Sequence, residues 1–173
     1  MRAKLFLQKN TTTRLRQSKI VEGKSFEDVI NSANEVEDIP GYNFSEADKS
    51  TLVISSDINA NVINLYYTKR TDISYKVNYY IEGTRIKAKE SKVVSNKQIG
   101  DIVYALDERI EIDRYLYMGA EQDSIIIDAD TNNNVINLYY ARISNLIVRF
   151  LDKNTNEPVR NELRYTSLVG DNY

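Results

Sequence analysis

Alternating hydrophobic and polar positions define the clearest element of the chain, a strand over residues 77–81. From Val77 to Ile81 every second residue is apolar or aromatic, and the residues between them form a second face. A period of two is typical of a strand with one buried face. The pattern then predicts a turn at residues 82–84 and a second strand over residues 86–94, with a counterpart over residues 15–21.

A helical period follows in residues 25–33. Apolar residues stand at positions 26, 29, 30 and 33, on one face of a helix, and Ser25 stands where a capping residue belongs. Residues 99–106 repeat the stripe with Ile99, Ile102, Val103 and Leu106. The spacing therefore predicts one short helix in each of two places.

Further strands are predicted at residues 42–44, 52–54 and 62–67, separated by a Pro-Gly turn and an Asn-rich turn. The resulting order, β-β-α-β-β-β, predicts an α+β unit in which one short helix lies across a mixed sheet. The alternative is a small β-sandwich with a short helical crossover.

The chain is internally duplicated. Residues 18–70 align with residues 91–143 at an offset of 73 without a gap, and 19 of these 53 positions are identical. A third, partial copy begins at Val148. The duplication predicts repeat 1 at residues 1–70, repeat 2 at residues 71–143 and the start of an incomplete third repeat at residues 144–173, which is expected to be the least ordered segment unless it packs on repeat 2.

The amino-acid composition limits the kinds of catalytic and binding site that the chain can form. The chain has no cysteine and no histidine, which removes thiol nucleophiles, the usual general base and most zinc sites. The formal net charge is -2, with no basic run that would favour nucleic acid. We therefore expect no enzymatic activity, no cofactor or metal and no nucleic-acid partner, and the sequence shows neither a signal peptide nor a membrane-spanning segment.

Several ordered motifs carry a family resemblance. They are Val-x-Tyr-Tyr-x-Glu-Gly-Thr at 77–84, Ser-Lys-Val-Val at 91–94, Ile-Gly-Asp at 99–101, Tyr115 and Asn-Val-Ile-Asn-Leu-Tyr-Tyr at 134–140. In this order the chain resembles the MucBP, or mucin-binding-protein, repeat of Gram-positive bacterial surface proteins.

The resemblance implies a β-grasp-like (ubiquitin-like) fold in tandem, an extracellular location at the cell surface or cell wall, and, as in some members, mucin or another host glycoprotein as partner. It predicts a segment of a surface adhesin, monomeric within a longer array, that binds glycans weakly and multivalently. The alternative is a non-binding structural spacer or stalk.

Tyrosines are the candidate ligand-binding residues, because Tyr can stack on a sugar and hydrogen-bond its edge. Strand parity assigns Ile63, Leu65 and Tyr67 to the core and leaves Tyr66 on the other face, together with Tyr80 and Tyr139. The favoured alternative is that these three tyrosines only fill sheet faces and repeat junctions.

Two segments rich in oxygen and amide groups suggest other chemistry. Residues 128–134 have the alternating oxygens of a calcium loop but lack its central Gly and terminal Glu, and their counterpart keeps only Asp57, Asn59 and Asn61, so an Asn-rich turn is favoured.

Asn64 and Asn137 lie mid-strand. An isopeptide bond to Lys76 is conceivable there, but a hydrogen bond to a neighbouring strand is the favoured interpretation.

Paired carboxylates are the last candidates. Glu35 with Glu37, and Glu108 with Glu111, have the composition of glycosidase acids, but nothing in the sequence indicates a cleft around them. We expect these side chains to lie on a solvated surface.

Overall fold

The computed structural model describes residues 2–6 and 14–169, with side chains from residue 14 onward. These residues form two compact units. The first comprises the described residues up to Ile73 with Ser95–Asp101 and Ile127–Thr131, and the second comprises Ser74–Val94, Ile102–Ile126 and the described residues from Asn132 onward.

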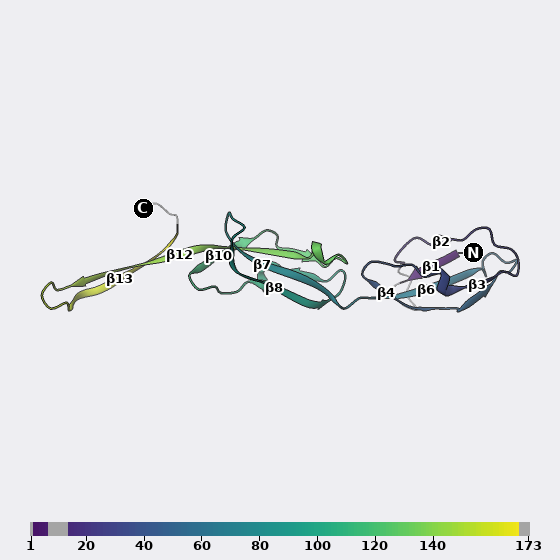
Figure 1. Cartoon of the computed structure of the whole chain (residues 1–173), viewed down its shortest axis with the longest axis horizontal. Helices are drawn as coiled ribbons and strands as arrows, with labels where there is room; N and C mark the ends of the chain where they lie inside the picture. The colour runs from purple at the N-terminus through teal and green to yellow at the C-terminus, as the bar shows by residue number, and fades with distance from the viewer. Residues whose placement is uncertain (1, 7–13, 170–173) are drawn as a thin grey trace. The chain divides into compact units, whose positions relative to one another are not determined.

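Repeat 1 is built from two small sheets (Figure 1). The larger sheet has the order β2-β1-β6-β4, and β3 pairs with β5 in a separate two-stranded ribbon. The strands are β1 (Arg2–Phe6), β2 (Lys19–Ile20), β3 (Val29–Asn31), β4 (Tyr42–Ala47), β5 (Thr51–Val53) and β6 (Val62–Lys69).

Repeat 2 has the same topology, with the sheet order β8-β7-β12-β10 and the ribbon β9-β11. The strands are β7 (Ile73–Ile81), β8 (Lys87–Lys97), β9 (Ile102–Tyr104), β10 (Tyr115–Ala120), β11 (Ser124–Ile126) and β12 (Val135–Leu151). Strand β13 (Pro158–Leu168) follows in the segment after repeat 2. In both repeats the first strand runs parallel to the closing strand, β1 with β6 and β7 with β12.

The α+β prediction is wrong, because the structure is all-β and sandwich-like. Among the described residues the helical segments are three short 3-10 turns: η1 (Ser32–Glu35), η2 (Ala105–Glu108) and η3 (Thr131–Asn133). The β-grasp helix and the helical crossover of the sandwich alternative are therefore both absent from this part of the chain.

The predicted helix is replaced by a short strand and a 3-10 turn. Ile30 is buried, whereas Phe26 and Val29 are 65% and 68% exposed, so the apolar stripe is not one face. Val29 and Ile30 are β-branched and favour a strand, and β3 gains a pairing partner in β5. A nine-residue window could not reveal that partner, which lies some twenty residues further along the chain.

A carboxylate closes the turn before each ribbon, in place of the predicted Ser25 cap. The backbone N–H of Ser25 donates to Asp28 Oδ2 at 2.7 Å, and the N–H of Gln98 donates to Asp101 Oδ2 at 2.9 Å. These two turns are equivalent at the offset of 73. The acid shared by the two copies is therefore a turn-closing residue.

The core of each repeat lies between the sheet and the ribbon. Ile63 and Leu65 are fully buried and Tyr67 is nearly so, which confirms the predicted parity of the closing strand. They pack against Ile30 and Leu52 of the ribbon. In repeat 2 the equivalent residues of β12 are buried to the same degree: Ile136, Leu138 and Tyr140.

Strand β1 pairs with β6 one residue out of step with the pairing of β7 with β12. Lys4 pairs with Asn64 and Phe6 with Tyr66, whereas Asn78 pairs with Asn137 and Tyr80 with Tyr139. Each residue of β1 is thus equivalent to the residue of β7 that lies 74 positions later, whereas residues 18–70 are equivalent to residues 73 positions later. Parallel pairing with β6 sets the register of β1.

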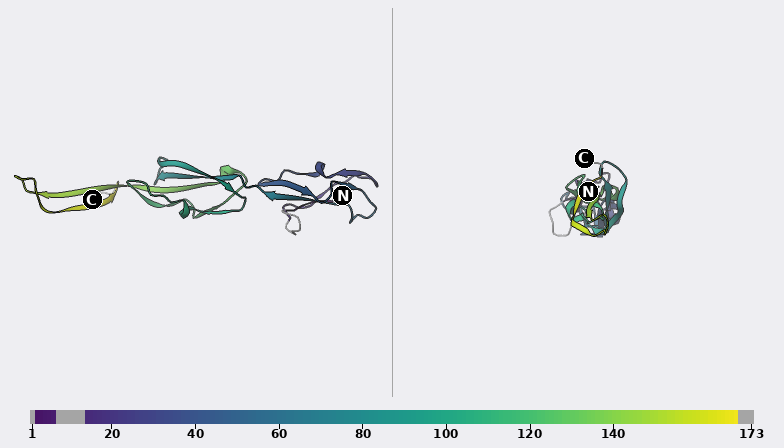
Figure 2. Two further views of the ribbon diagram at one scale, coloured as in Figure 1. Left: turned by 90° about the horizontal axis from the view of Figure 1, so that it is seen from below. Right: turned by 90° about the vertical axis from the view of Figure 1, so that its left-hand side faces the viewer.

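Strand β12 continues past the sheet and pairs with β13 in a two-stranded ribbon (Figures 1 and 2). Val148 to Leu151, the start of the partial third copy, belongs to this ribbon. The partial copy also has Val-Gly-Asp at residues 169–171, which matches Ile-Gly-Asp at 99–101, and residues 170–171 lie outside the described residues. Leu146 and Tyr165 on the ribbon are 59% and 51% exposed, so this segment has little core of its own.

Candidate functional site

Tyr80 and Tyr139 lie side by side on the outer face of the repeat 2 sheet. The two residues are paired across β7 and β12, and their ring centroids are 6.4 Å apart with 33° between the planes. Both side chains are partly exposed. Neighbouring rings on one sheet face present a flat aromatic surface to solvent.

Arg85 adds a charge to this surface. Its guanidinium carbon lies 5.6 Å from the centroid of the Tyr80 ring, in cation–π geometry. Beside the rings is an open hollow of about 450 Å³, lined by Glu82, Gly83, Thr84, Arg85 and Tyr139. We call Tyr80, Tyr139 and Arg85 with this hollow the tyrosine patch.

The turn after β7 holds Arg85 in place. Gly83 has a φ of +70°, a conformation that favours glycine. The Thr84 hydroxyl donates to the carbonyl of Ile81 at 2.8 Å and accepts from the N–H of Ile86 at 3.1 Å. The Glu-Gly-Thr motif therefore builds a defined turn that carries one acid and one base beside the tyrosines.

The structure brings together two of the three predicted site residues. Tyr66 is the repeat 1 equivalent of Tyr139, and the β1–β6 register places it opposite Phe6. Sequence reasoning missed Arg85, because nothing in the spacing indicates that the turn would bring its side chain back over Tyr80.

The alternate tyrosines of the closing strands have a structural role. The Tyr67 hydroxyl donates to the Glu37 carbonyl at 3.0 Å, and the Tyr140 hydroxyl donates to the Ile110 carbonyl at 3.0 Å. Burial raises the pKa of both Tyr67 and Tyr140 above the usual value. Each closing strand thus fixes the loop that crosses above it.

The expectation of solvated carboxylates is wrong for Glu35 and Glu108, which are buried. Lys19 Nζ lies 3.0 Å from Glu35 Oε2, and Lys92 forms the equivalent ion pair with Glu108. The Tyr75 hydroxyl also donates to Glu108, at 2.6 Å. The pKa of Tyr75 is strongly raised. Burial is the largest cause, and the hydrogen bond to the Glu108 carboxylate is the second.

These carboxylates are tied into the fold as ion pairs. Their signal was present in the sequence, since both the lysines and the glutamates are identical between the two copies. In each repeat the lysine pairs with the glutamate. This ion pair is a structural reason for the identity of both residues in the two copies. The other two members of the proposed carboxylate pairs, Glu37 and Glu111, are not among the buried polar residues.

Asn137 forms a side-chain hydrogen bond to the neighbouring strand β7, as favoured from the sequence, whereas Asn64 bonds to Asp48, which directly follows β4. Asn78 Nδ2 donates to Asn137 Oδ1 at 2.8 Å, and Asn137 Nδ2 donates in turn to Glu121. In repeat 1 Asn64 Nδ2 donates to Asp48 Oδ2 at 2.6 Å. Lys76, the conceivable isopeptide partner, is exposed.

The Asn-rich segments form turns. Asn61 closes its turn by donating from Nδ2 to the Ser55 carbonyl at 2.8 Å, and the equivalent Asn134 is fully buried and bonds to the Ser74 carbonyl at 3.2 Å. Among the described residues no group of three or more acidic side chains is arranged to hold a metal ion.

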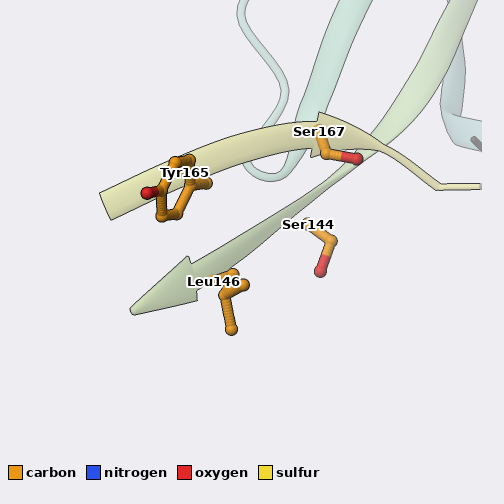
Figure 3. A pocket seen from close by; sticks show the side chains of 4 residues that line it. All are labelled: Ser144, Leu146, Tyr165 and Ser167. Atoms are coloured by element: carbon orange, nitrogen blue, oxygen red, sulfur yellow. The ribbon is translucent and has the colours of Figure 1, made fainter. Parts of the chain in front are cut away.

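A second hollow, of about 370 Å³, lies on the β12–β13 ribbon. It is lined by Ser144, Leu146, Tyr165 and Ser167, whose side chains are shown in Figure 3. Its lining has no charged group and only two hydroxyls besides the tyrosine. It offers less for polar recognition than the tyrosine patch, and we do not assign a ligand to it.

Comparison with known proteins adds little. No protein-family model matches the chain, and a search of curated proteins finds no match. Among solved structures, the type 2 repeat of the mucus binding protein MUB from Lactobacillus reuteri is 11% identical and has a TM-score of 0.32, covering 97% of this chain and 91% of that one.

In the part of the chain that the structure describes, no helix is long and apolar enough to cross a membrane.

Proposed function

We propose that this chain is a tandem-repeat segment of a bacterial cell-surface adhesin that binds mucin-type glycans or host glycoproteins weakly at each repeat. The observation that carries the proposal is the tyrosine patch of repeat 2. Its paired rings suit stacking on the apolar face of a sugar, and the neighbouring Arg85 suits hydrogen bonding to sugar hydroxyls.

The sequence motifs that resemble MucBP repeats support the same proposal, and they include both tyrosines of the patch. Tyr80 and the Glu-Gly-Thr turn belong to the first motif, and Tyr139 belongs to the last. An open, shallow surface supports weak binding at a single repeat. Tandem repeats would then gain avidity through an effective concentration set by the linkers between them.

The test is binding of the whole chain to immobilised mucin, before and after periodate oxidation of its glycans. A Tyr80→Ala/Tyr139→Ala variant removes the patch, and a Tyr66→Ala/Tyr139→Ala variant removes one equivalent ring from each repeat. The matched control is Tyr104→Ala/Tyr165→Ala, which removes two tyrosines that are 55% and 51% exposed elsewhere.

Saturable binding that is lost on oxidation and in the Tyr80/Tyr139 variant, but retained in the control, supports the proposal. Equal loss in the control variant would contradict the assignment to the patch. No binding to mucin at high protein concentration would favour the non-binding spacer instead.

A further inference from the structure

Each repeat begins and ends with strands that lie side by side. In repeat 2 the first strand, β7, is parallel to the closing part of β12, with six paired positions from Val135↔Lys76 to Tyr140↔Ile81. In repeat 1, β1 and β6 are paired in the same way, from Arg2↔Val62 to Phe6↔Tyr66. The strands most distant in the sequence of a repeat are thus neighbours in its sheet.

Parallel pairing has a consequence for a chain under tension. Tension on repeat 2 enters at the start of β7 and leaves where the paired part of β12 ends. In a parallel pair these two points lie at opposite ends of the ladder. The pull is then along the strands, and it loads all the evenly spaced hydrogen bonds together.

We propose that this parallel pair is a mechanical clamp, which gives each repeat a load-bearing function independent of any ligand. Forced unfolding is governed by the unfolding rate, and here that rate depends on breaking the whole ladder in one step. The sheet geometry by itself supports this inference. It would stand even if the tyrosine patch bound no glycan.

Backbone bonds extend the clamp at both ends. The N–H of Lys76 donates to the Asn134 carbonyl at 2.8 Å, and the N–H of Glu82 donates to the Tyr140 carbonyl at 2.9 Å. Between them, the Asn78–Asn137 side-chain bond joins the two strands directly. Asn78 is only 6% exposed, so this bond is largely protected from competing water.

The β12–β13 ribbon has the opposite geometry. It is antiparallel, and Ile143, where its part of β12 begins, pairs with Leu168, where β13 ends. The N–H of Val169 donates to the Arg142 carbonyl at 2.8 Å, so the chain enters and leaves the ribbon at one end. Tension on this ribbon therefore separates its paired residues one pair at a time. The β12–β13 ribbon is therefore expected to rupture at a low force, and it serves as the reference for the β7–β12 pair in the same molecule.

Direction-selective pulling on the full chain tests the clamp. The sequence contains no cysteine, so two introduced cysteines define the points of attachment. Asp72→Cys with Arg142→Cys loads the parallel pair from opposite ends. Asp72→Cys with Asn133→Cys loads the same two strands from one end, and all three positions are exposed. Arg142→Cys with Val169→Cys loads the ribbon.

The expected result is a high rupture force for the Asp72/Arg142 attachment and lower forces for the other two, at equal loading rate. Equal rupture forces for the Asp72/Arg142 and Asp72/Asn133 attachments would overturn the proposal. Circular dichroism and chemical unfolding of each unattached variant establish that all three have the same fold and stability. The comparison then reports geometry alone.

A side-chain variant tests the Asn78–Asn137 bond separately. Asn137→Ala is expected to lower the rupture force of the Asp72/Arg142 attachment and to change the Asp72/Asn133 force less. Asn145→Ala is the matched control, because Asn145 lies on the same strand in the ribbon and bonds to Thr166 there. An equal drop in both attachments would contradict a role for this bond in the clamp.

Discussion

Lys92 forms an ion pair with the buried carboxylate of Glu108, and repeat 1 reproduces it with Lys19 and Glu35. The glutamate side chains are 9% and 10% exposed, whereas the lysines are 44% and 39% exposed. Each lysine therefore covers a carboxylate from the solvent side. In repeat 2 the ion pair joins the 3-10 turn η2, which follows β9, to β8, and in repeat 1 it joins η1, which follows β3, to β2.

We predict that Lys92→Met destabilises the protein by about 1–3 kcal/mol, because it leaves a buried carboxylate without its cation. The partial exposure of Lys92 keeps the cost below that of a fully buried pair. Urea unfolding of the whole chain measures it. Lys87→Met removes an exposed ion pair with Glu90 and is the control, expected within about 0.5 kcal/mol of wild type. A cost for Lys92→Met no larger than that for Lys87→Met would contradict the prediction.

Adjacent tyrosines of β12 should respond differently to loss of the hydroxyl. Tyr140→Phe removes the bonds to the Ile110 backbone and is expected to cost about 0.5–1.5 kcal/mol. Tyr139→Phe changes a partly exposed residue on the other face and should cost close to nothing. Chemical unfolding of the two variants makes the comparison, and equal costs would disprove the role given to the Tyr140 hydroxyl.

Alkaline pH should destabilise the protein through its buried tyrosines. Burial raises the pKa of Tyr67, Tyr75, Tyr79 and Tyr140 above the ordinary tyrosine value of 10.0. A raised folded-state pKa means that the stabilisation is complete below pH 10.0 and is lost as the pH rises above it, because the unfolded chain then releases protons that the folded chain retains. Unfolding free energy measured between pH 8 and pH 12 should therefore be flat and then fall. Tyr75→Phe should make the fall less steep, and an unchanged slope in this variant would count against its contribution.

Hydrogen exchange should divide β12 into two parts. Amides of residues 135–140 are in the sheet, whereas residues 143–151 pair with β13, apart from the N–H of Ile143, which donates to the Arg114 carbonyl. A two-stranded ribbon is marginally stable by itself. We expect faster exchange in residues 143–151 and 158–168 than in residues 135–140. Equal protection in both parts would show that the ribbon is stabilised by contacts beyond its own two strands.

Strand parity and repetition could be predicted from the sequence for physical reasons. The alternation in Val62–Tyr67 identifies its buried side without further information, because successive side chains of a strand point to opposite faces. Identity between copies also marked the lysines and glutamates of the ion pairs, although not their role. The helix prediction failed because Phe26, Val29 and Ile30 fit a helical face, while strand pairing with residues 51–53 decided their conformation.

By itself, the sequence therefore determined the duplication, the closing strands and which of their tyrosines face the core, since these follow from local period and self-similarity. Only the tertiary structure decided the all-β fold, the ion pairs, the position of Arg85 over Tyr80 and the parallel pairing of β7 with β12. Each of these joins residues through contacts that depend on the path of the whole chain, which a local pattern does not record.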